Sequence, residues 1–392
     1  MNNTEIVKQS LKKRYAREKR FQFYGRCAVS VGFIFLVLLL LDITVKAIPA
    51  FSVTEIKLDL ALDRESLGLP GSGEINSEML SAVNYGGVIK EALRHAFPEV
   101  SSRKHKKLLY NMVSNGAEFE IADKLQGNPD LVREQRFSIW VKADDDIDTV
   151  YKLGTRTSRV DDRQVEMIEQ LQRDESIRIA FNTTFFSASD SREPEQAGIR
   201  GAIAGSFWTL LVTLLVSLPV GMAAAIYLEE FAPQNRITDF IEININNLAA
   251  VPSIVFGLLG LAVFINFFGM PRSAPLVGGL VLSLMTLPTI IIASRAAIKS
   301  VPPSIKEAAL GIGASKMQVV FHHTLPLAMP GILTGSIIGM AQALGETAPL
   351  LMIGMVAFIV DIPGSITDPA AALPVQIYLC LLYTSDAADD RT

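Results

Sequence analysis

Long apolar stretches alternate with polar segments along the chain. The first apolar stretch covers residues 28–48, and three more of similar length follow at 202–228, 248–268 and 276–297. A helix of about 20 residues crosses ~30 Å of hydrocarbon, so each stretch predicts a membrane-spanning helix. A fifth stretch covers residues 327–360 and would be ~51 Å long as one helix, so we expect it to be interrupted.

Between the first two stretches lies a polar segment, residues 51–198, that predicts a folded domain of its own. Apolar residues three and four positions apart predict helices over residues 74–97 and 104–125. Alternating polar and apolar residues predict strands over 137–141 and 177–181. We therefore expect an all-α polytopic membrane protein with an inserted α+β domain.

The composition agrees with a membrane protein that carries a water-soluble domain. Of 392 residues, 49% are apolar and 19% are charged, and the mean hydropathy is +0.33. Residues 51–198 hold 26 acids against 19 bases, whereas residues 199–392 hold 11 acids and 8 bases. The net charge of −4 argues against binding by bulk positive charge, so we expect no nucleic-acid partner. Cys27 and Cys380 are too few for a zinc cluster or a disulfide framework.

The basic residues predict the direction in which the chain crosses the membrane. Residues 1–27 form a basic arm with eight Lys/Arg and two acids, which places the N-terminus in the cytoplasm. Counting crossings then places residues 51–198 outside the cell membrane and residues 298–326 in the cytoplasm. The segment 295–316 carries four bases against the single acid Glu307, which independently predicts a cytoplasmic location.

A cleaved signal peptide is the alternative interpretation of residues 1–48, because a basic region before a short apolar core also fits one. Ile48-Pro49-Ala50 is a poor small-x-small cleavage site, and further spans follow it. We therefore favour an uncleaved transmembrane helix over residues 28–48.

The end of the chain departs from the membrane pattern. Residues 381–392, LLYTSDAADDRT, look like translated cloning or adaptor read-through and are expected to be non-native. The membrane domain is then expected to cover residues 199–379. Five crossings would leave the C-terminus outside, so a sixth spanning helix is expected to be missing after it.

We expect no metal site. The acidic run at residues 144–148 lacks the glycine and the terminal glutamate of an EF-hand loop, and it predicts a solvated acidic turn. His322 and His323 are adjacent in the sequence, and adjacent residues on a helix point in different directions.

The basic loop is interpreted as a docking surface for a cytoplasmic partner, although composition alone would favour an ordinary loop. One short helix is expected to end at Gly313, and a second is expected to begin over residues 317–321. The loop holds no nucleotide site, because residues 311–316 fail the G-x-x-x-x-G-K-[ST] spacing. Energy has to come from another polypeptide, and no cofactor is expected on this chain.

Six residues of this region resemble the EAA motif of ABC importer permeases. They are Glu307, Ala308, Ala309, Gly313, Leu325 and Pro326, at the spacings of that motif. The resemblance implies a coupling helix that lies in a cleft of an ATPase subunit, with Glu307, Ala308, Ala309 and Gly313 as coupling residues. His323 departs from the motif, which usually has an aliphatic residue there.

Two features of the fifth apolar stretch suggest roles. Small residues recur every four positions and predict a face for close helix packing: Gly331, Gly335 and Gly339. Glu346 is an ionisable residue within an apolar stretch, which points to a transport pathway, and a structural role beside a neighbouring helix stays equally open. Gln342 lies one turn earlier on the same face, and Pro349 is expected to bend or break the helix.

The run from Gly345 to Leu351, GETAPLL, resembles the signature of phosphate permeases of the PstA and PstC type. Residues 218–230 and 250–257 add to the resemblance, which covers residues 198–378, and the order of the motifs favours PstA. Some PstA proteins also carry an extra N-terminal outer domain of unknown role, which residues 51–198 resemble.

One position departs from the relatives. An arginine often stands in them where this chain has Gln342, so a direct cationic role of this subunit is in doubt. A phosphate beside Glu346 then needs compensation from the partner subunit, from backbone donors or from a protonated Glu346, and these alternatives stay open. Thr347 could supply a neutral donor, so Glu346, Thr347 and Gln342 are the candidate pathway residues.

The resemblance implies a non-enzymatic permease subunit of an ABC phosphate importer, multi-pass in the bacterial inner membrane, with the ABC importer permease fold of about six transmembrane helices. The implied partners are a second permease subunit of the PstC type, a PstB-type ATPase dimer that binds ATP, and a periplasmic phosphate-binding protein. The alternatives are a permease for another oxyanion, such as molybdate or sulfate, and a membrane sensor that uses residues 51–198.

Overall fold

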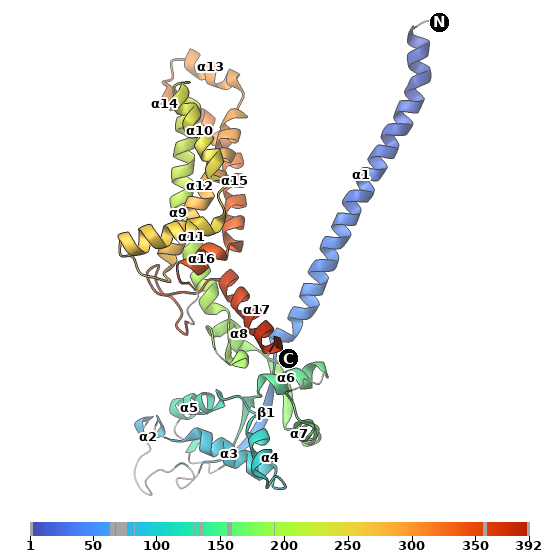
Figure 1. Ribbon diagram of the computed structural model, residues 1–392, viewed down its shortest axis with the longest axis vertical. Coiled ribbons are helices and arrows are strands. Elements are labelled where there is room, and N and C mark those ends of the chain that lie inside the picture. Colours follow the sequence, from blue (N-terminus) through green and yellow to red (C-terminus); the bar gives the residue numbers. More distant parts are fainter. Residues whose placement is uncertain are drawn as a thin grey trace. The chain divides into compact units, whose positions relative to one another are not determined.

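The computed structural model divides the chain into two compact units, Met1–Thr183 and Thr184–Thr392 (Figure 1). It describes residues 3–62, 67, 77–81, 83–128, 131–132, 136–154, 159–191, 193–355 and 359–389. Parts of two predicted elements therefore lie outside the described residues: 74–76 and 82 in the first unit, and 356–358 in the second.

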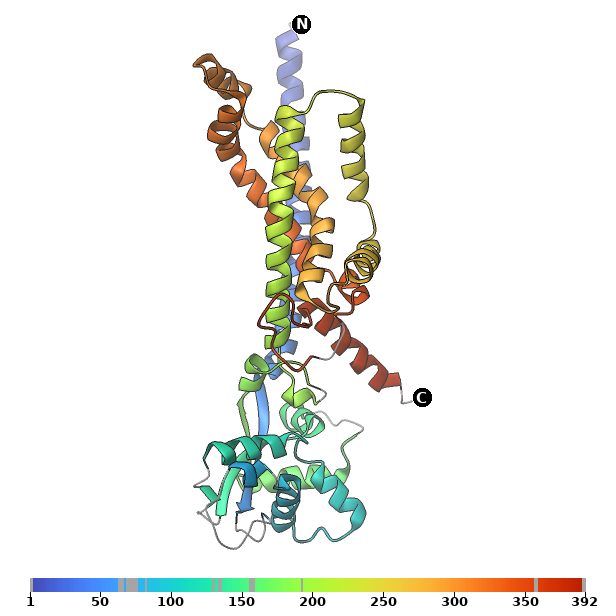
Figure 2. The same cartoon turned by 90° about the vertical axis from the view of Figure 1, so that its left-hand side faces the viewer.

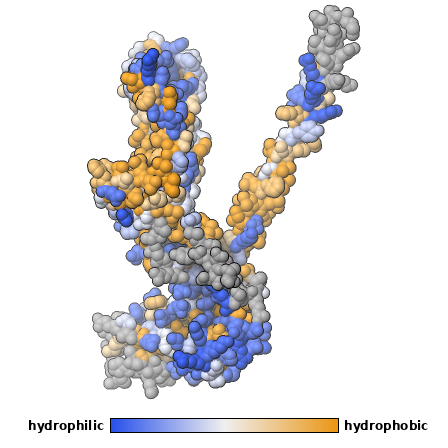
Figure 3. Space-filling model, viewed as in Figure 1, coloured by the Kyte–Doolittle hydropathy of each residue, from blue (hydrophilic) through white to orange (hydrophobic). Residues whose placement is uncertain are grey.

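The first unit begins with α1 (Asn3–Ala47), one continuous helix that joins the basic arm to the first predicted span. The span-length apolar window lies within Arg14–Phe51, and none of that window is buried. Figure 3 shows hydrophobic surface over the middle of α1, with hydrophilic surface on both sides of it. A helix with an exposed apolar surface on all sides is typical of a membrane span.

A three-stranded antiparallel sheet follows α1 and a short 3₁₀ turn, Ile48–Phe51. The strand order is β2-β1-β3, with β1 (Ser52–Ala61) in the centre, β2 (Arg136–Lys142) on one side and β3 (Ile177–Phe181) on the other. The two predicted strands are confirmed as β2 and β3. β1 was not predicted, although its polar and apolar residues alternate with the period of a strand.

One face of the sheet forms the core of this unit. Ile56, Leu58 and Leu60 of β1 are at most 2% exposed, and they pack with Ile139 and Val141 of β2. Helices cover this face and contribute the rest of the core, chiefly α3 (Tyr85–Ala96), α5 (Ala117–Gly127) and α7 (Asp162–Arg173). The expected α+β character of the N-terminal region is thus confirmed.

The two helices predicted in this region are each divided. Residues 74–97 include α2 (Ser77–Ser81) and α3, and Asn84 caps α3 by accepting a hydrogen bond from the Gly87 amide at 3.0 Å. Residues 104–125 include most of α4 (Arg103–Tyr110) and of α5, which are separated by a turn whose Met112 and Val113 are buried in the core. In that turn the Ser114 hydroxyl accepts from the Gly116 amide at 3.0 Å.

The acidic run at residues 144–148 is not the solvated turn that its composition predicted. It begins α6 (Asp145–Leu153), and the carboxylate of Asp144 caps that helix by accepting from the Asp146 amide at 3.2 Å. Acidic side chains are favourable in a first helical turn because the helix dipole is positive there. Asp148 also holds β1, since its carboxylate accepts from the Thr54 amide at 2.7 Å and pairs with Lys152 at 2.7 Å.

Half of one edge of β1 is open. β3 pairs with β1 only over Ser52–Ile56, and within the described residues no strand continues along residues 57–61 on that side. The Lys57 amide donates to the Ser176 carbonyl at 2.8 Å. Ser176 directly precedes β3, and the residues before it lead back to α7, away from β1. A groove of about 390 Å³ lies along the open edge, walled by the ends of α3 and α7, including His95 and Leu171.

The second unit is built around three long apolar helices. They are α9 (Arg200–Ile226), continued by a π-helical turn η4 (Tyr227–Phe231), α12 (Pro275–Lys299) and α15 (Leu325–Gly345). α12 packs against both α9 and α15 (Figures 1 and 2). Short elements, α8 (Thr183–Ser187) and a 3₁₀ turn Pro194–Gln196, precede α9.

Two contacts show that α9 and α12 run parallel. Near the middle of α9 the Thr213 hydroxyl donates to the Gly279 carbonyl of α12 at 3.2 Å. Towards the C-terminal ends of both helices, Glu229 of η4 pairs with Arg295 of α12. Since the two helices are parallel, the segment between them has to return from the C-terminal end of α9 to the opposite end of the bundle, where α12 begins.

That crossing is a bent pair of helices. α10 (Arg236–Leu248) and α11 (Ser253–Gly260), which η5 (Leu261–Phe267) continues as a π-helix, meet at an angle of 100°. The predicted span over residues 248–268 is therefore replaced by this bent pair, with the break at residues 249–252. Pro252, which has no amide hydrogen, lies at the break and precedes α11.

The described residues contain four helices that could cross a membrane by length and composition, or five if the bent pair is one span. The two short helices expected in the basic loop are present as α13 (Pro303–Gly311) and α14 (Lys316–Val319), followed by a π-helical turn η6 (Val320–Thr324). The interruption of the fifth apolar stretch is also confirmed: α15 ends at Gly345 and α16 (Ala348–Met352) follows.

The last helix, α17 (Leu373–Asp389), is anchored beside the start of α9. The Leu373 amide donates to the Ser206 hydroxyl at 2.8 Å, and the Gln376 side chain donates to the Gly198 carbonyl at 3.1 Å. These contacts tie the beginning of α17 to the end of the bundle where α9 and α12 start.

Candidate functional site

The loop between α12 and α15 has a backbone fixed by capping at two places. Gly313 has a φ of +93°, and its amide donates to the Leu310 carbonyl at 3.0 Å. The next amide, that of Ala314, donates to the Ala309 carbonyl at 3.1 Å. These are the two hydrogen bonds of a Schellman motif, which ends α13. Ser315 then starts α14 with a capping box.

This geometry places the EAA residues on two different surfaces of α13. Glu307 and Ala308 are exposed, whereas Ala309 is only 5% exposed. Ala309 therefore packs inward, and Glu307 and Ala308 present the surface that a partner could touch. Gly313 lies in the turn rather than on that surface, so its role is to shape the loop.

Replacing Gly313 by alanine should loosen this loop without creating a clash. Nothing lies within 4 Å of a Cβ at this position, but the positive φ is unfavourable for a side chain by ~1–2 kcal/mol. We expect Gly313→Ala to reduce transport several-fold at unchanged protein level. Gly311→Ala is the matched control, since Gly311 also faces open space but has no left-handed φ. Equal transport by the two variants would contradict the shaping role.

The break between α15 and α16 lies at Glu346 and Thr347. Glu346 is the C-cap of α15, with a ψ of 122° that turns the chain out of the helix. Sequence analysis expected Pro349 to bend the helix, but the break comes before it. Pro349 lies in the first turn of α16, where its missing amide hydrogen leaves no bond unmade.

The pathway candidates lie around this break. Glu346 and Thr347 are half-buried and Gln342 is exposed. In the described part of the chain, no hydrogen bond or ion pair joins these three side chains. The backbone of α16 is held close to α11, since a Cβ at Gly257 would lie 2.7 Å from the Cα of Pro349. Glu346 is therefore presented by a packed turn, with its own side chain left available.

The three glycines predicted to pack differ in how closely they meet α12. A Cβ at Gly331 would lie 2.7 Å from the Cβ of Ala297, and one at Gly335 would overlap that of Ala293. A Cβ at Gly339 would make only an ordinary contact, 3.6 Å from Ile290. α15 therefore runs antiparallel to α12, with its closest approach near Gly335.

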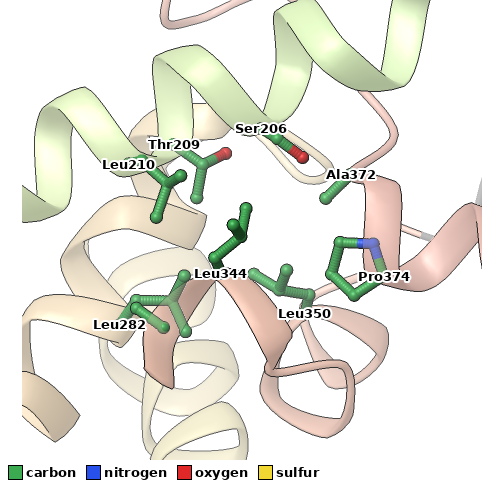
Figure 4. Close-up of a pocket in the computed structure, with 9 residues that line it drawn as sticks. Ser206, Thr209, Leu210, Leu282, Leu344, Leu350, Ala372 and Pro374 are labelled. Carbon is green, nitrogen blue, oxygen red and sulfur yellow. The ribbon is translucent and has the colours of Figure 1, made fainter. Parts of the chain in front are cut away.

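A small cavity lies where α9, α12, α15, α16 and α17 meet (Figure 4). Its volume is about 10 Å³, which is room for about one water molecule and not for an oxyanion. Two hydroxyls, of Ser206 and Thr209, and a ring of apolar side chains line it. The Thr209 hydroxyl donates to the Gly205 carbonyl at 2.7 Å, so it is already engaged with its own helix.

Glu229 and Glu230 received no role from the sequence. In the structure both are partly buried at the end of α9, where they pair with bases of α12 and α13. The signal in the sequence was two adjacent acids at the end of an apolar helix, within the run 218–230 that adds to the family resemblance, and it does not identify their partners.

Family models match two separate parts of the chain. Residues 217–387 match "Binding-protein-dependent transport system inner membrane component", and residues 8–161 match "Domain of unknown function (DUF3333)". The second match includes the basic arm, α1 and most of the α+β region.

Curated relatives match about half of the chain. The probable ABC transporter permease protein YqgI of Bacillus subtilis is 37% identical over 43% of this chain and 56% of its own length. YqgH of the same organism is 33% identical over 48% and 62%. The phosphate transport system permease protein PstA of Haemophilus influenzae is 29% identical over 51% and 69%. The chain thus spans less than two thirds of the length of YqgI and of YqgH.

Among solved structures, one described as inward-facing conformations of the MetNI methionine ABC transporter aligns with a TM-score of 0.34 and 19% identity, over 50% of this chain and 92% of that one. This likeness is too low to place any helix. The sequence matches, in contrast, show similarity to the permease component of ABC transporters, and not to the ATPase, over residues 217–387, and this region follows the DUF3333 match.

Proposed function

We propose that the chain is the permease subunit of an ATP-driven importer of inorganic phosphate. The α13–α14 loop carries this proposal, because its capped backbone presents Glu307 and Ala308 on an exposed surface suited to an ATPase subunit. The GETAPLL run and the PstA relatives, at about 30% identity, support phosphate as the substrate. ATP hydrolysis on the partner would move the loop and switch the access of the pathway.

The direction of the helices supports the proposed topology. If α9 and α12 both run towards the cytoplasm, the α13–α14 loop and the end of α9 meet there, and the break at Glu346 lies towards the periplasm. A cytoplasmic N-terminus then places residues 51–198 in the periplasm. The proposed partners are a second permease subunit, an ATPase dimer and a periplasmic phosphate-binding protein.

The transport pathway is proposed to lie on the exposed side of α15. The small cavity where α9, α12, α15, α16 and α17 meet holds about one water, so it does not offer a path for phosphate, and the proposed path lies between this subunit and a second permease subunit. Gln342 is exposed on α15, and Glu346 and Thr347 follow at its end. Positive charge for the anion would have to come from the second subunit, because Gln342 is neutral.

Uptake of radiolabelled phosphate tests this function. Phosphate-starved cells that lack the gene would be complemented with it and assayed with unlabelled molybdate or sulfate as competitors. We expect restored uptake that resists both competitors. Uptake blocked by molybdate or sulfate would indicate a permease for that oxyanion. Membrane-inserted protein that restores no uptake would contradict a phosphate permease and favour a sensor.

Replacing Glu346 by glutamine should lower uptake about tenfold, as expected when ~1.4 kcal/mol of stabilisation is lost. Glutamine keeps the size of the side chain but cannot ionise or exchange a proton. Glu346→Asp should retain more activity than Glu346→Gln. Asp361→Asn, on an exposed loop outside the helices, is the control. Wild-type uptake by Glu346→Gln at equal protein level would contradict a role for the ionisable group.

A further inference from the structure

Two adjacent carboxylates at the end of α9 bind two different elements. Glu229 accepts a hydrogen bond from Nε of Arg295, in α12, at 2.5 Å. Glu230 pairs with Nζ of Lys306, in α13, at 2.5 Å. Both acids belong to the π-helical turn η4, and adjacent residues of a helix point in different directions. The turn therefore places one acid against α12 and the other against α13.

These ion pairs are shielded from water. The side chains of Glu229 and Glu230 are 10% and 14% exposed, and those of Arg295 and Lys306 are 13% and 26% exposed. Pairs that are partly buried and hydrogen-bonded are less screened than surface pairs, and removal of one partner leaves an uncompensated charge. They therefore restrict how the elements that carry them can move.

A third element joins the same network. Arg295 also pairs with Glu242 of α10 at 2.9 Å. Lys299 approaches Glu229 at 3.4 Å, but its side chain is 62% exposed. An exposed lysine of this kind contributes little, so Arg295 is the cation that connects α9, α10 and α12.

α13 has few other firm attachments to the bundle. It follows α12 after a short Ser300–Pro302 turn, and on its far side the chain continues through Gly313 into α14. Its inward contacts are apolar and involve Ile305 and Ala309. Apolar contacts are non-directional and allow sliding, whereas an ion pair at 2.5 Å fixes both position and direction.

We propose that Glu230–Lys306 and Glu229–Arg295 form an ion-pair clamp that makes the coupling helix α13 move together with α9 and α12. The clamp rests on the proposed function, since it transmits displacement of α13 by an ATPase to the helices that form the transport path. Its four members are positioning residues, and none of them has to touch the transported anion. Without the clamp, displacement of α13 is absorbed in the Ser300–Pro302 turn.

Charge reversal with rescue tests the clamp in the reconstituted permease–ATPase complex. Lys306→Glu or Glu230→Lys alone should raise the ATP hydrolysed per phosphate transported by about tenfold, equivalent to ~1.4 kcal/mol of lost coupling. The double variant E230K/K306E restores the pair with reversed polarity and should return the ratio towards the wild-type value. Arg272→Glu makes the same change of charge at an exposed residue before α12, for which the described residues show no ion pair, and should leave the ratio unchanged.

A distance measurement tests the clamp independently of transport. Spin labels at Tyr227 of η4 and Leu310 of α13, both exposed, would be introduced into the full chain with Cys27 and Cys380 replaced by alanine. We expect a narrow distance distribution in the otherwise unaltered chain, a broad one with Lys306→Glu, and a narrow one again in the double variant.

The two measurements separate the clamp from the proposed function. If the wild-type complex transports no phosphate, the proposed substrate is wrong, and the distance distributions still decide whether α13 is clamped to η4. Distributions of equal width in the wild type and Lys306→Glu would overturn the clamp. So would an unchanged coupling ratio in both single variants, or a double variant that assembles and is not restored.

Discussion

Replacing Glu307 by lysine should abolish phosphate uptake and leave the protein in the membrane. Glu307 is exposed on α13, and no ion pair to it is seen in the described part of the chain. The substitution should therefore not disturb the fold of this subunit. It reverses the charge of the surface that the ATPase is proposed to contact, and a like-charge contact there costs several kcal/mol, so uptake should fall about 100-fold.

The measurement compares uptake with the amount of inserted protein and with binding of the ATPase subunit. Asp361→Lys makes the same reversal on an exposed loop that is tied to the opposite end of α12, through the Ile366 carbonyl and the Leu276 amide. It should leave uptake unchanged. Normal uptake by Glu307→Lys would show that α13 does not dock the ATPase through this residue.

Replacing Gly335 by alanine should destabilise the helix bundle. The added Cβ would overlap the Cβ of Ala293, so α12 and α15 would have to move apart. Overpacking of a close helix contact typically costs ~1–3 kcal/mol. In a membrane this contact is more important still, because close packing rather than the hydrophobic effect holds spanning helices together.

The same substitution at Gly339 is the matched control, since its Cβ would make only an ordinary contact at 3.6 Å. Unfolding of the purified full chain by SDS in mild detergent would compare the two. We expect a lower midpoint for Gly335→Ala and a midpoint near that of the wild type for Gly339→Ala. Equal midpoints would contradict a close approach of α12 and α15 at Gly335.

Helices of consistently apolar sequence, and loops that contain residues typical of helix ends, could be predicted from the sequence. α9 and α12 consist almost wholly of apolar residues, so their positions follow from hydropathy. The fold of the α13–α14 loop was accessible too, because Gly313 and Ser315 are residue types that end and begin helices. These features depend on the types of residues that are neighbours in the sequence, so one sequence is enough to predict them.

Features that depend on distant residues were not accessible in the same way. The bend before α11 joins the amphipathic helix α10, which hydropathy assigns to a loop, to the apolar α11 at an angle of 100°. The partners of Glu229 and Glu230 are 66 and 76 residues away along the chain. β1 is a different case, because its alternating pattern was present and the interpretation of the polar segment overlooked it.

The open half-edge of β1 has a consequence for how this protein behaves at high density in a membrane. A strand edge with unsatisfied main-chain groups can recruit strands of other molecules and lead to aggregation. Lys57 and Asp59 place charges of opposite sign along this stretch, and the ends of α3 and α7 wall the groove beside it. Charged side chains beside a strand edge disfavour pairing with another strand, so we expect Lys57 and Asp59 to limit association of neighbouring copies through this edge.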